Sequence, residues 1–132
     1  MIFLDSNIPM YLVGSDHPNK ATARRLLEQA IVENEPLATD AEVFQEILDR
    51  YVAIGRRDAI PAAFDALLGV IDVVLPIEFE DVNRARRLVE KVQRVSARDA
   101  LHVAVMQRHK VNRIMSFHAA FDAIAGIIRI SG

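Results

Sequence analysis

Apolar residues along the chain follow two spacings, and these predict the order of strands and helices. Short uninterrupted apolar runs predict strands at residues 1–4, 37–39, 73–75, 113–116 and 127–130. Longer segments in which apolar residues recur at every third or fourth position predict helices at residues 9–13, 19–33, 40–54, 58–71, 79–93 and 97–109. Strands that alternate with helices are typical of a three-layer α/β/α domain. We therefore expect a mostly parallel central sheet of four or five short strands, with the nearly all-apolar helix at 97–109 at its centre.

Composition narrows the class of protein. With 132 residues, 52% of them hydrophobic, and only five glycines and five prolines, residues 1–132 fit a single globular domain. No apolar run approaches the roughly 20 residues that span a bilayer, and residues 1–4 lack the features of a signal peptide, so we expect a cytoplasmic protein that does not contact a membrane. The absence of cysteine excludes disulfides, thiolate nucleophiles and cysteine-based zinc sites. A net charge of -2 argues against a strongly basic nucleic-acid binder, but sixteen lysines and arginines allow local basic patches.

Acidic residues gather where predicted strands end or the next helices begin. In parallel α/β sheets, sites lie at the carboxyl ends of the strands. The polar residues in such places are Asp5, Glu42, Glu46, Asp99, His118 and Asp122. Carboxylates at one sheet edge repel one another unless a cation lies between them, so the pattern predicts a site for a hard divalent ion.

Each acid also has a structural interpretation. Asp5 can cap the first helix, and Ser96 with Asp99 resembles a capping box. Residues 39–42 (TDAE) fit the capping box more closely, which assigns Glu42 to the helix N-terminus. Glu46, one turn further on, has no such role, although a solvated helix face remains an alternative for it. We prefer Glu46 as the site acid and keep Glu42 as second choice.

Three motifs in this order resemble the PIN-domain ribonucleases, in particular the VapC-like toxins of type II toxin-antitoxin pairs. Residues 1–7 (MIFLDSN) are similar to the family's opening strand with its D-x-N, residues 46–48 (EIL) to its internal acidic motif, and residues 99–104 (DALHVA) to its central helix motif. The resemblance covers essentially the whole chain and implies a PIN-like domain. It implies that Asp5, Glu46 and Asp99 are the catalytic metal ligands, and that Asn7 supports them.

The fourth motif of the family, T-x-D, is altered in this chain. Ser116, Phe117 and His118 stand in its place, so histidine replaces the expected aspartate and Ser116 is a supporting residue. Imidazole is a poor ligand for Mg²⁺ but an acceptable one for Mn²⁺ or Zn²⁺. His118 could therefore change the metal preference, donate a proton, or leave a one-metal enzyme. Asp122, four residues on, is the nearest carboxylate that could substitute.

The resemblance implies a Mg²⁺-dependent endoribonuclease, with Mn²⁺ as an alternative ion, that acts as the toxin of a toxin-antitoxin pair. We expect an RNA substrate, a cognate antitoxin protein and a homodimer. The apolar residues 9–13 fit either the core or a groove for an antitoxin segment. Candidate phosphate-binding cations, which also fit a solvated surface, are Arg24, Arg25, Arg56, Arg57 and Arg98.

Two other functions remain open at this point. One is a catalytically weakened PIN module that acts by binding RNA or protein, an alternative that His118 itself motivates. The other is a receiver-like signalling domain that binds Mg²⁺ at parallel strand ends; it would need a lysine after a late strand, which the chain lacks. His102, on the apolar helix, is expected to be a packed or hydrogen-bonded side chain rather than a site residue.

Overall fold

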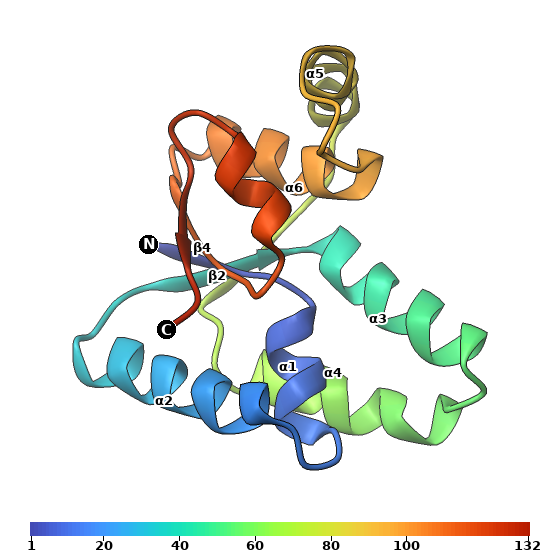
Figure 1. The fold of residues 1–132 in the computed structure, drawn as a ribbon, viewed down its shortest axis with the longest axis vertical. Coiled ribbons are helices and arrows are strands. Elements are labelled where there is room, and N and C mark those ends of the chain that lie inside the picture. Colours follow the sequence, from blue (N-terminus) through green and yellow to red (C-terminus); the bar gives the residue numbers. More distant parts are fainter.

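Five short parallel strands form one sheet in a computed structural model that describes residues 1–132. The strands are β1 (Ile2–Leu4), β2 (Leu37–Asp40), β3 (Val73–Leu75), β4 (Arg113–Met115) and β5 (Ile128–Ile130). Their order in the sheet is β3-β2-β1-β4-β5, with every neighbouring pair parallel (Figure 1). All five predicted strands are confirmed, and the sheet is parallel throughout.

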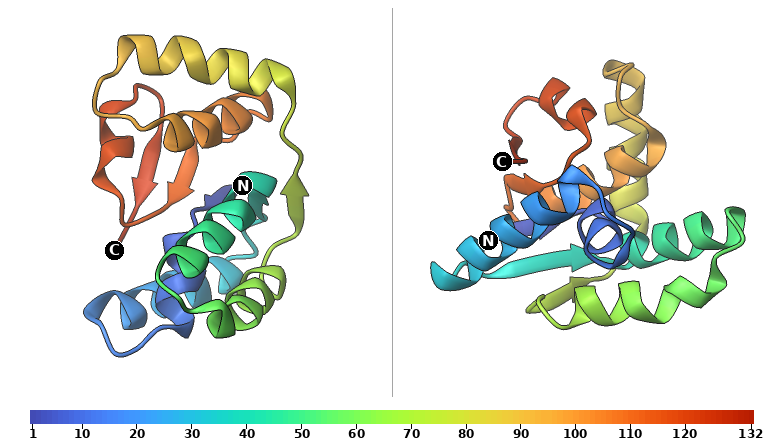
Figure 2. Two further views of the ribbon diagram at one scale, coloured as in Figure 1. Left: turned by 90° about the vertical axis from the view of Figure 1, so that its right-hand side faces the viewer. Right: turned by 60° about the horizontal axis from the view of Figure 1, so that its bottom comes forward.

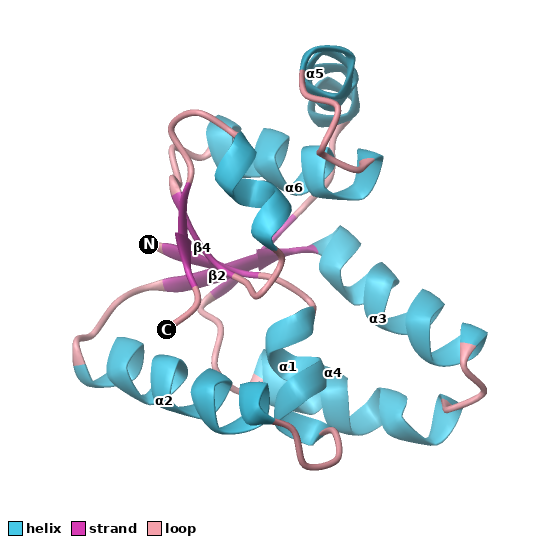
Figure 3. Ribbon diagram, in the orientation of Figure 1, coloured by secondary structure: helices cyan, strands magenta, loops and turns pink.

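Helices cover both faces of this sheet, which confirms the predicted three layers. They are α1 (Asn7–Val13), α2 (Pro18–Val32), α3 (Ala41–Ala53), α4 (Ile60–Leu68), α5 (Phe79–Lys91) and α6 (Ala97–Arg108), with the 3₁₀ helices η1 (Arg57–Ala59) and η2 (Ala119–Ala123). Helices α1, α2 and α4 lie on one side of the sheet, and α5, α6 and η2 on the other; Figures 2 and 3 show the same arrangement from other directions and by element type. None of the helices combines the length and apolarity needed to cross a membrane.

The core lies where β1 meets α6. Phe3 and Leu4 in β1, and Val103, Ala104 and Met106 in α6, are all fully inaccessible to solvent. Burial on both faces explains why β1 reads as a continuous apolar run rather than as an alternating one. It also confirms that the segment at 97–109 forms the central helix.

The start of α3 differs from the prediction. Thr39 is still part of β2, and its hydroxyl donates to the Leu4 carbonyl of the neighbouring strand at 2.9 Å. Asp40 caps α3 instead, because its Oδ1 accepts the backbone N–H of Val43 at 2.9 Å. The predicted capping box of Thr39 and Glu42 is therefore wrong, since the strand runs one residue further than its apolar residues indicated.

Candidate metal centre

The three central strands end beside one another and place polar residues at a common edge. Asp5 follows β1, Asp40 ends β2, and Ser116 follows β4. The chain leaves β1 into helices on one face of the sheet and enters β4 from α6 on the other face, which makes the β1–β4 boundary a topological switch point. Across it, the Ser116 hydroxyl donates to Asp5 Oδ2 at 2.6 Å.

Asp5 is held firmly in this crevice. Only 3% of the residue is exposed. Its Oδ1 accepts the Ser6 backbone N–H at 2.8 Å, and its Oδ2 accepts the Asn7 side-chain amide at 3.3 Å in addition to the Ser116 hydroxyl. Burial raises the pKa of Asp5, against the opposing effects of the His102 charge and these hydrogen bonds. Asn7 and Ser116 thus lie where the sequence placed them, next to the carboxylate that they were expected to support.

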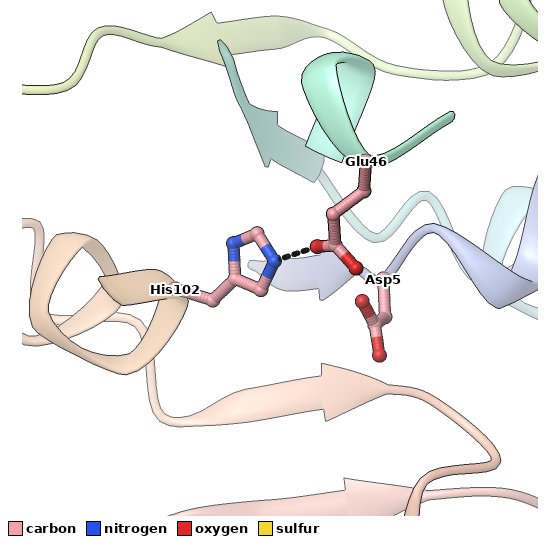
Figure 4. A group of neighbouring side chains, drawn as sticks. All are labelled: Asp5, Glu46 and His102. Carbon is pink, nitrogen blue, oxygen red and sulfur yellow. Dashed lines mark hydrogen bonds and ion pairs between the residues drawn. The ribbon is translucent and has the colours of Figure 1, made fainter. Parts of the chain in front are cut away.

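Glu46 reaches the same crevice from α3. Its Oε2 accepts a hydrogen bond from the Ser6 hydroxyl at 3.2 Å, and its Oε1 contacts His102 Nε2 (Figure 4). Ligand atoms from Asp5, Glu46 and His102 all lie within 4.8 Å of one another. One oxygen or nitrogen from each of three elements is therefore directed toward a common space.

Glu42 lies outside this group, as the preference for Glu46 anticipated. Its carboxylate lies 3.4 Å from the Arg98 guanidinium at the start of α6. Partial burial raises the pKa of Glu42, and the charges of His102 and Arg98 oppose that rise. One helical turn separates the two glutamates, and only the later one reaches the ends of the central strands.

His102 has a larger part in the site than the sequence suggested. It is completely buried, with Nδ1 2.8 Å from Asp40 Oδ2 and Nε2 against Glu46. Burial alone would lower the pKa of His102, but its contacts with the two carboxylates outweigh burial and raise the pKa well above the ordinary value. The two carboxylates thus favour the protonated form of the imidazole. Asp40 was missed altogether, although it met the criterion of an acid at a strand end.

Asp99 contributes a buried carboxylate from the first turn of α6. Its backbone N–H donates to the Ser96 hydroxyl at 3.1 Å, which confirms Ser96 as the helix cap. The residue is 5% exposed, no hydrogen bond reaches its buried Oδ2, and burial raises its pKa with a further contribution from the Glu46 charge. Half-exposed His118 places Nδ1 2.7 Å from that oxygen, without hydrogen-bond geometry.

Asp122 does not substitute at the site. It lies in η2, exposed at the surface, where the Arg129 guanidinium of β5 donates to both of its oxygens at 2.9 Å. The expectation that Asp122 could replace the missing aspartate is not supported, because its carboxylate is already paired with Arg129 of the edge strand. Arg129 also donates to the Ser116 carbonyl at 3.3 Å, so this pair reinforces the backbone behind the site.

The donor set fits a hard divalent cation. Asp5 and Glu46 supply carboxylate oxygens, the ligands that Mg²⁺ prefers. The buried Asp99 Oδ2 has no hydrogen bond, and the His118 ring nitrogen lies 2.7 Å from it. Buried polar atoms without a partner are rare in proteins and call for an explanation such as an ion. Burial raises the pKa values of Asp5 and Asp99, and the nearby histidine charges and hydrogen bonds offset that rise only in part.

Comparisons with known proteins agree with this geometry. The sequence profile of the PIN domain matches residues 2–127. Ribonuclease VapC13 of Mycobacterium tuberculosis is 59% identical over 131 residues, which cover 99% of this chain and 100% of that protein. Ribonuclease VapC23 of the same organism is 41% identical over 117 residues, covering 89% of this chain and 92% of that protein.

Solved structures share the fold. VapC20 of Mycobacterium tuberculosis, described as a sarcin-ricin loop cleaving toxin, aligns over 100% of both chains with a TM-score of 0.82 and 21% identity. A chain of VapBC2 from Rickettsia felis, solved with a promoter DNA fragment, aligns over 98% of both chains with a TM-score of 0.75 and 16% identity. A toxin-antitoxin complex from Klebsiella pneumoniae aligns over 97% of this chain and 96% of that chain, with a TM-score of 0.68 and 17% identity.

Proposed function

Because the chain belongs to the PIN-domain family, with curated relatives named VapC ribonucleases, we propose that it is a metal-dependent endoribonuclease and the toxin of a toxin-antitoxin pair. The observation that supports this proposal is the cluster of Asp5, Glu46 and His102, whose ligand atoms lie within 4.8 Å of one another. Asp99 adds a buried carboxylate whose pKa is raised in part by the Glu46 charge. Membership of the PIN-domain family removes the reason to consider a receiver-like signalling domain. We extend the proposal to residues 1–132 as one PIN-like domain.

In this proposal Asp5, Glu46 and Asp99 hold Mg²⁺, or Mn²⁺ in its place. When bound, the ion would supply activation of a water for in-line attack and stabilisation of charge on the phosphate. Ser116 and Asn7 fix the orientation of Asp5 with hydrogen bonds at 2.6 and 3.3 Å. The Ser6 hydroxyl fixes one oxygen of Glu46 in the same way. The chain's own contribution is thus a rigid set of oxygen ligands at the end of β1.

His118 favours a second candidate function. Because it lies against Asp99 where the family motif has an aspartate, its imidazole can compete with an ion for that carboxylate. A protein weakened in this way would act by binding RNA or protein rather than by cleaving RNA. Comparison of the wild-type protein with His118→Asp separates the two candidates, since a weakened site gains cleavage when the aspartate is restored.

The proposed partners are an RNA substrate, an antitoxin protein and a second copy of the chain, and the proposed location is the cytoplasm, where RNA and an antitoxin are available. Structural neighbours support the antitoxin, because several of them are toxin-antitoxin or VapBC complexes.

The test is cleavage of cellular RNA by the purified protein with and without Mg²⁺. We expect Asp5→Asn and Glu46→Gln to abolish cleavage while circular dichroism shows the fold retained. Glu42→Gln is the matched control, because Glu42 lies one turn away and pairs with Arg98 instead. Equal cleavage by the wild type and both site variants would refute the proposal.

A further inference from the structure

We propose that a groove beside the metal centre binds single-stranded RNA through Arg50, Tyr11 and His17, an inference that rests on the proposed ribonuclease function. The groove encloses about 570 Å³. One wall comes from α1 and the loop after it, with Asn7, Tyr11 and His17, and the other from α3 and the turn beyond, with Glu46, Arg50 and Arg56. Since Asn7 and Glu46 also belong to the metal centre, the groove leads directly out of it.

Arg50 is the cation best placed for an RNA phosphate. It follows Glu46 by four residues on α3, so the two side chains lie on one face about one turn apart. Arg50 is exposed and forms no ion pair, whereas the Arg56 guanidinium is held by Asp58 at 3.0 Å. A guanidinium forms paired hydrogen bonds with phosphate oxygens. In this inference Arg50 binds the phosphate that follows or precedes the one at the ion.

The opposite wall offers a fixed aromatic surface. The Tyr11 ring contacts Phe117 edge-on, with centroids 5.3 Å apart, and lies 4.9 Å from the His17 ring. His17 Nδ1 accepts the Asn19 N–H at 3.0 Å, which leaves Nε2 as the protonated nitrogen of the neutral ring. Exposed His17 therefore presents a donor beside the half-buried Tyr11. Aromatic rings facing an arginine are the usual arrangement for unpaired nucleobases and their phosphates.

The experiment measures RNA binding separately from cleavage. A fluorescent single-stranded RNA of mixed sequence is titrated with full-length Asp99→Asn protein in Mg²⁺, with a duplex of the same sequence for comparison. Tyr11→Ala and Arg50→Ala are introduced into this background. The matched controls are Tyr11→Phe, which keeps the ring, and Arg87→Ala, which removes an exposed α5 arginine that forms no ion pair.

We expect Tyr11→Ala to weaken binding of the single strand at least about fivefold, as loss of one base stack does. Arg50→Ala should lower the slope of log affinity against log salt by about 0.7, the value for one phosphate contact. Both controls should bind like the background protein, and the duplex should bind more weakly than the single strand. Unchanged RNA affinity in both alanine variants overturns the inference, even if the wild type cleaves RNA. A protein segment would then be the better candidate ligand of the groove. Groove-dependent binding without any cleavage by the wild type supports the inference and refutes the ribonuclease proposal instead.

A different observation carries a second inference: the geometry points to Asp40 and His102 as positioning residues for Glu46. Asp40 is fully buried, with one oxygen capping α3 and the other 2.8 Å from His102 Nδ1. The opposite ring nitrogen of His102 contacts Glu46 Oε1. One carboxylate thus fixes both the helix that carries Glu46 and the imidazole that holds its head group. Because carboxylates already engage both nitrogens of His102, we assign it a supporting role rather than that of an ion ligand.

Variants at both positions test this role by binding of the metal alone. We expect His102→Gln to weaken Mg²⁺ and Mn²⁺ binding by equal factors of about 10 to 100, as loss of such supporting contacts does. Asp40→Asn should have the same effect with little loss of helix capping, since asparagine caps helices as well as aspartate. Thermal unfolding in EDTA verifies that each variant folds. If His102→Gln does not fold, Asp40→Asn alone tests the inference. Unchanged metal affinity in a folded variant overturns the inference, and so does a larger loss for Mn²⁺ than for Mg²⁺, because imidazole ligation favours Mn²⁺.

Discussion

Replacement of Asp99 by asparagine should make the metal-free protein more stable and at the same time remove its response to metal. The Asp99 carboxylate is 5% exposed and its Oδ2 forms no hydrogen bond. Burial raises its pKa, with a smaller contribution from the Glu46 charge, and outweighs the opposing charges of His102 and of His118, whose Nδ1 lies 2.7 Å away. For an acid whose pKa is higher in the folded state, the folded protein binds more protons, so stability falls as pH rises from the unfolded value of 3.8 through the folded value. At neutral pH the charged Asp99 carboxylate therefore lowers the free energy of unfolding, and the Asp99→Asn variant lacks this destabilisation.

The size of the effect follows from this linkage. Each pKa unit corresponds to about 1.4 kcal/mol, and relief of a single unfavourable functional group commonly adds about 0.5 to 2 kcal/mol. For a chain of this length, about 1 kcal/mol raises the melting temperature by roughly 3 to 4 °C. We expect Asp99→Asn to melt about 2 to 8 °C above the wild type in EDTA. Mg²⁺ at ten times its dissociation constant should stabilise the wild type by about 1.4 kcal/mol and the variant by much less.

Differential scanning fluorimetry at neutral pH, with EDTA or with a Mg²⁺ series, measures both effects. Asp65→Asn is the matched control, because Asp65 is exposed on α4 and forms no ion pair, and it should neither stabilise the protein nor change its response to metal. A lower melting temperature for Asp99→Asn in EDTA would show that the ionised carboxylate stabilises the fold. An undiminished Mg²⁺ shift in that variant would show that Asp99 is not a ligand.

Three further changes separate other parts of the structure. Ser116→Ala removes the 2.6 Å hydrogen bond to Asp5 and should weaken Mg²⁺ binding about tenfold in a calorimetric titration, whereas unchanged affinity would show that this bond does not orient the carboxylate. His118→Asp should increase Mg²⁺-dependent RNA cleavage in a gel assay. A loss of cleavage in this variant would show that the His118 imidazole contributes to the reaction. Burial opposes ionisation of Asp81, but the Arg108 hydrogen bonds and the helix cap outweigh it and lower its pKa. Asp81→Asn should therefore cost about 2 to 4 kcal/mol in urea unfolding at pH 7, and less as pH falls below 3.8 through the folded pKa; an equal cost at all pH values would refute the ion pair as its source.

Local pattern was sufficient for most of the fold. The apolar runs that became β1 to β5 could be recognised as strands because each is flanked by residues that begin or end helices, and that information lies within a few positions of each run. Element ends were less certain. The strand predicted to end at Thr39 continues to Asp40, and the Thr39 hydroxyl donates to the Leu4 carbonyl on the neighbouring strand instead of capping α3. Such a partner is 35 residues away and has no local signal.

The sequence by itself placed Asp5 after a strand and Glu46 and Asp99 near the starts of later helices, and the resemblance of their motifs to the PIN family singled out these three acids. Only the tertiary structure decided how they are held. Asp40 and His102 are 62 residues apart, and Ser116 and Asp5 are 111 apart, yet both pairs meet because parallel strands bring their carboxyl ends to one edge. A buried histidine belongs to the hydrophobic core or to a functional site according to which carboxylates the folded chain brings to its two nitrogens. The spacing of residues within one helix carries no information about those distant partners.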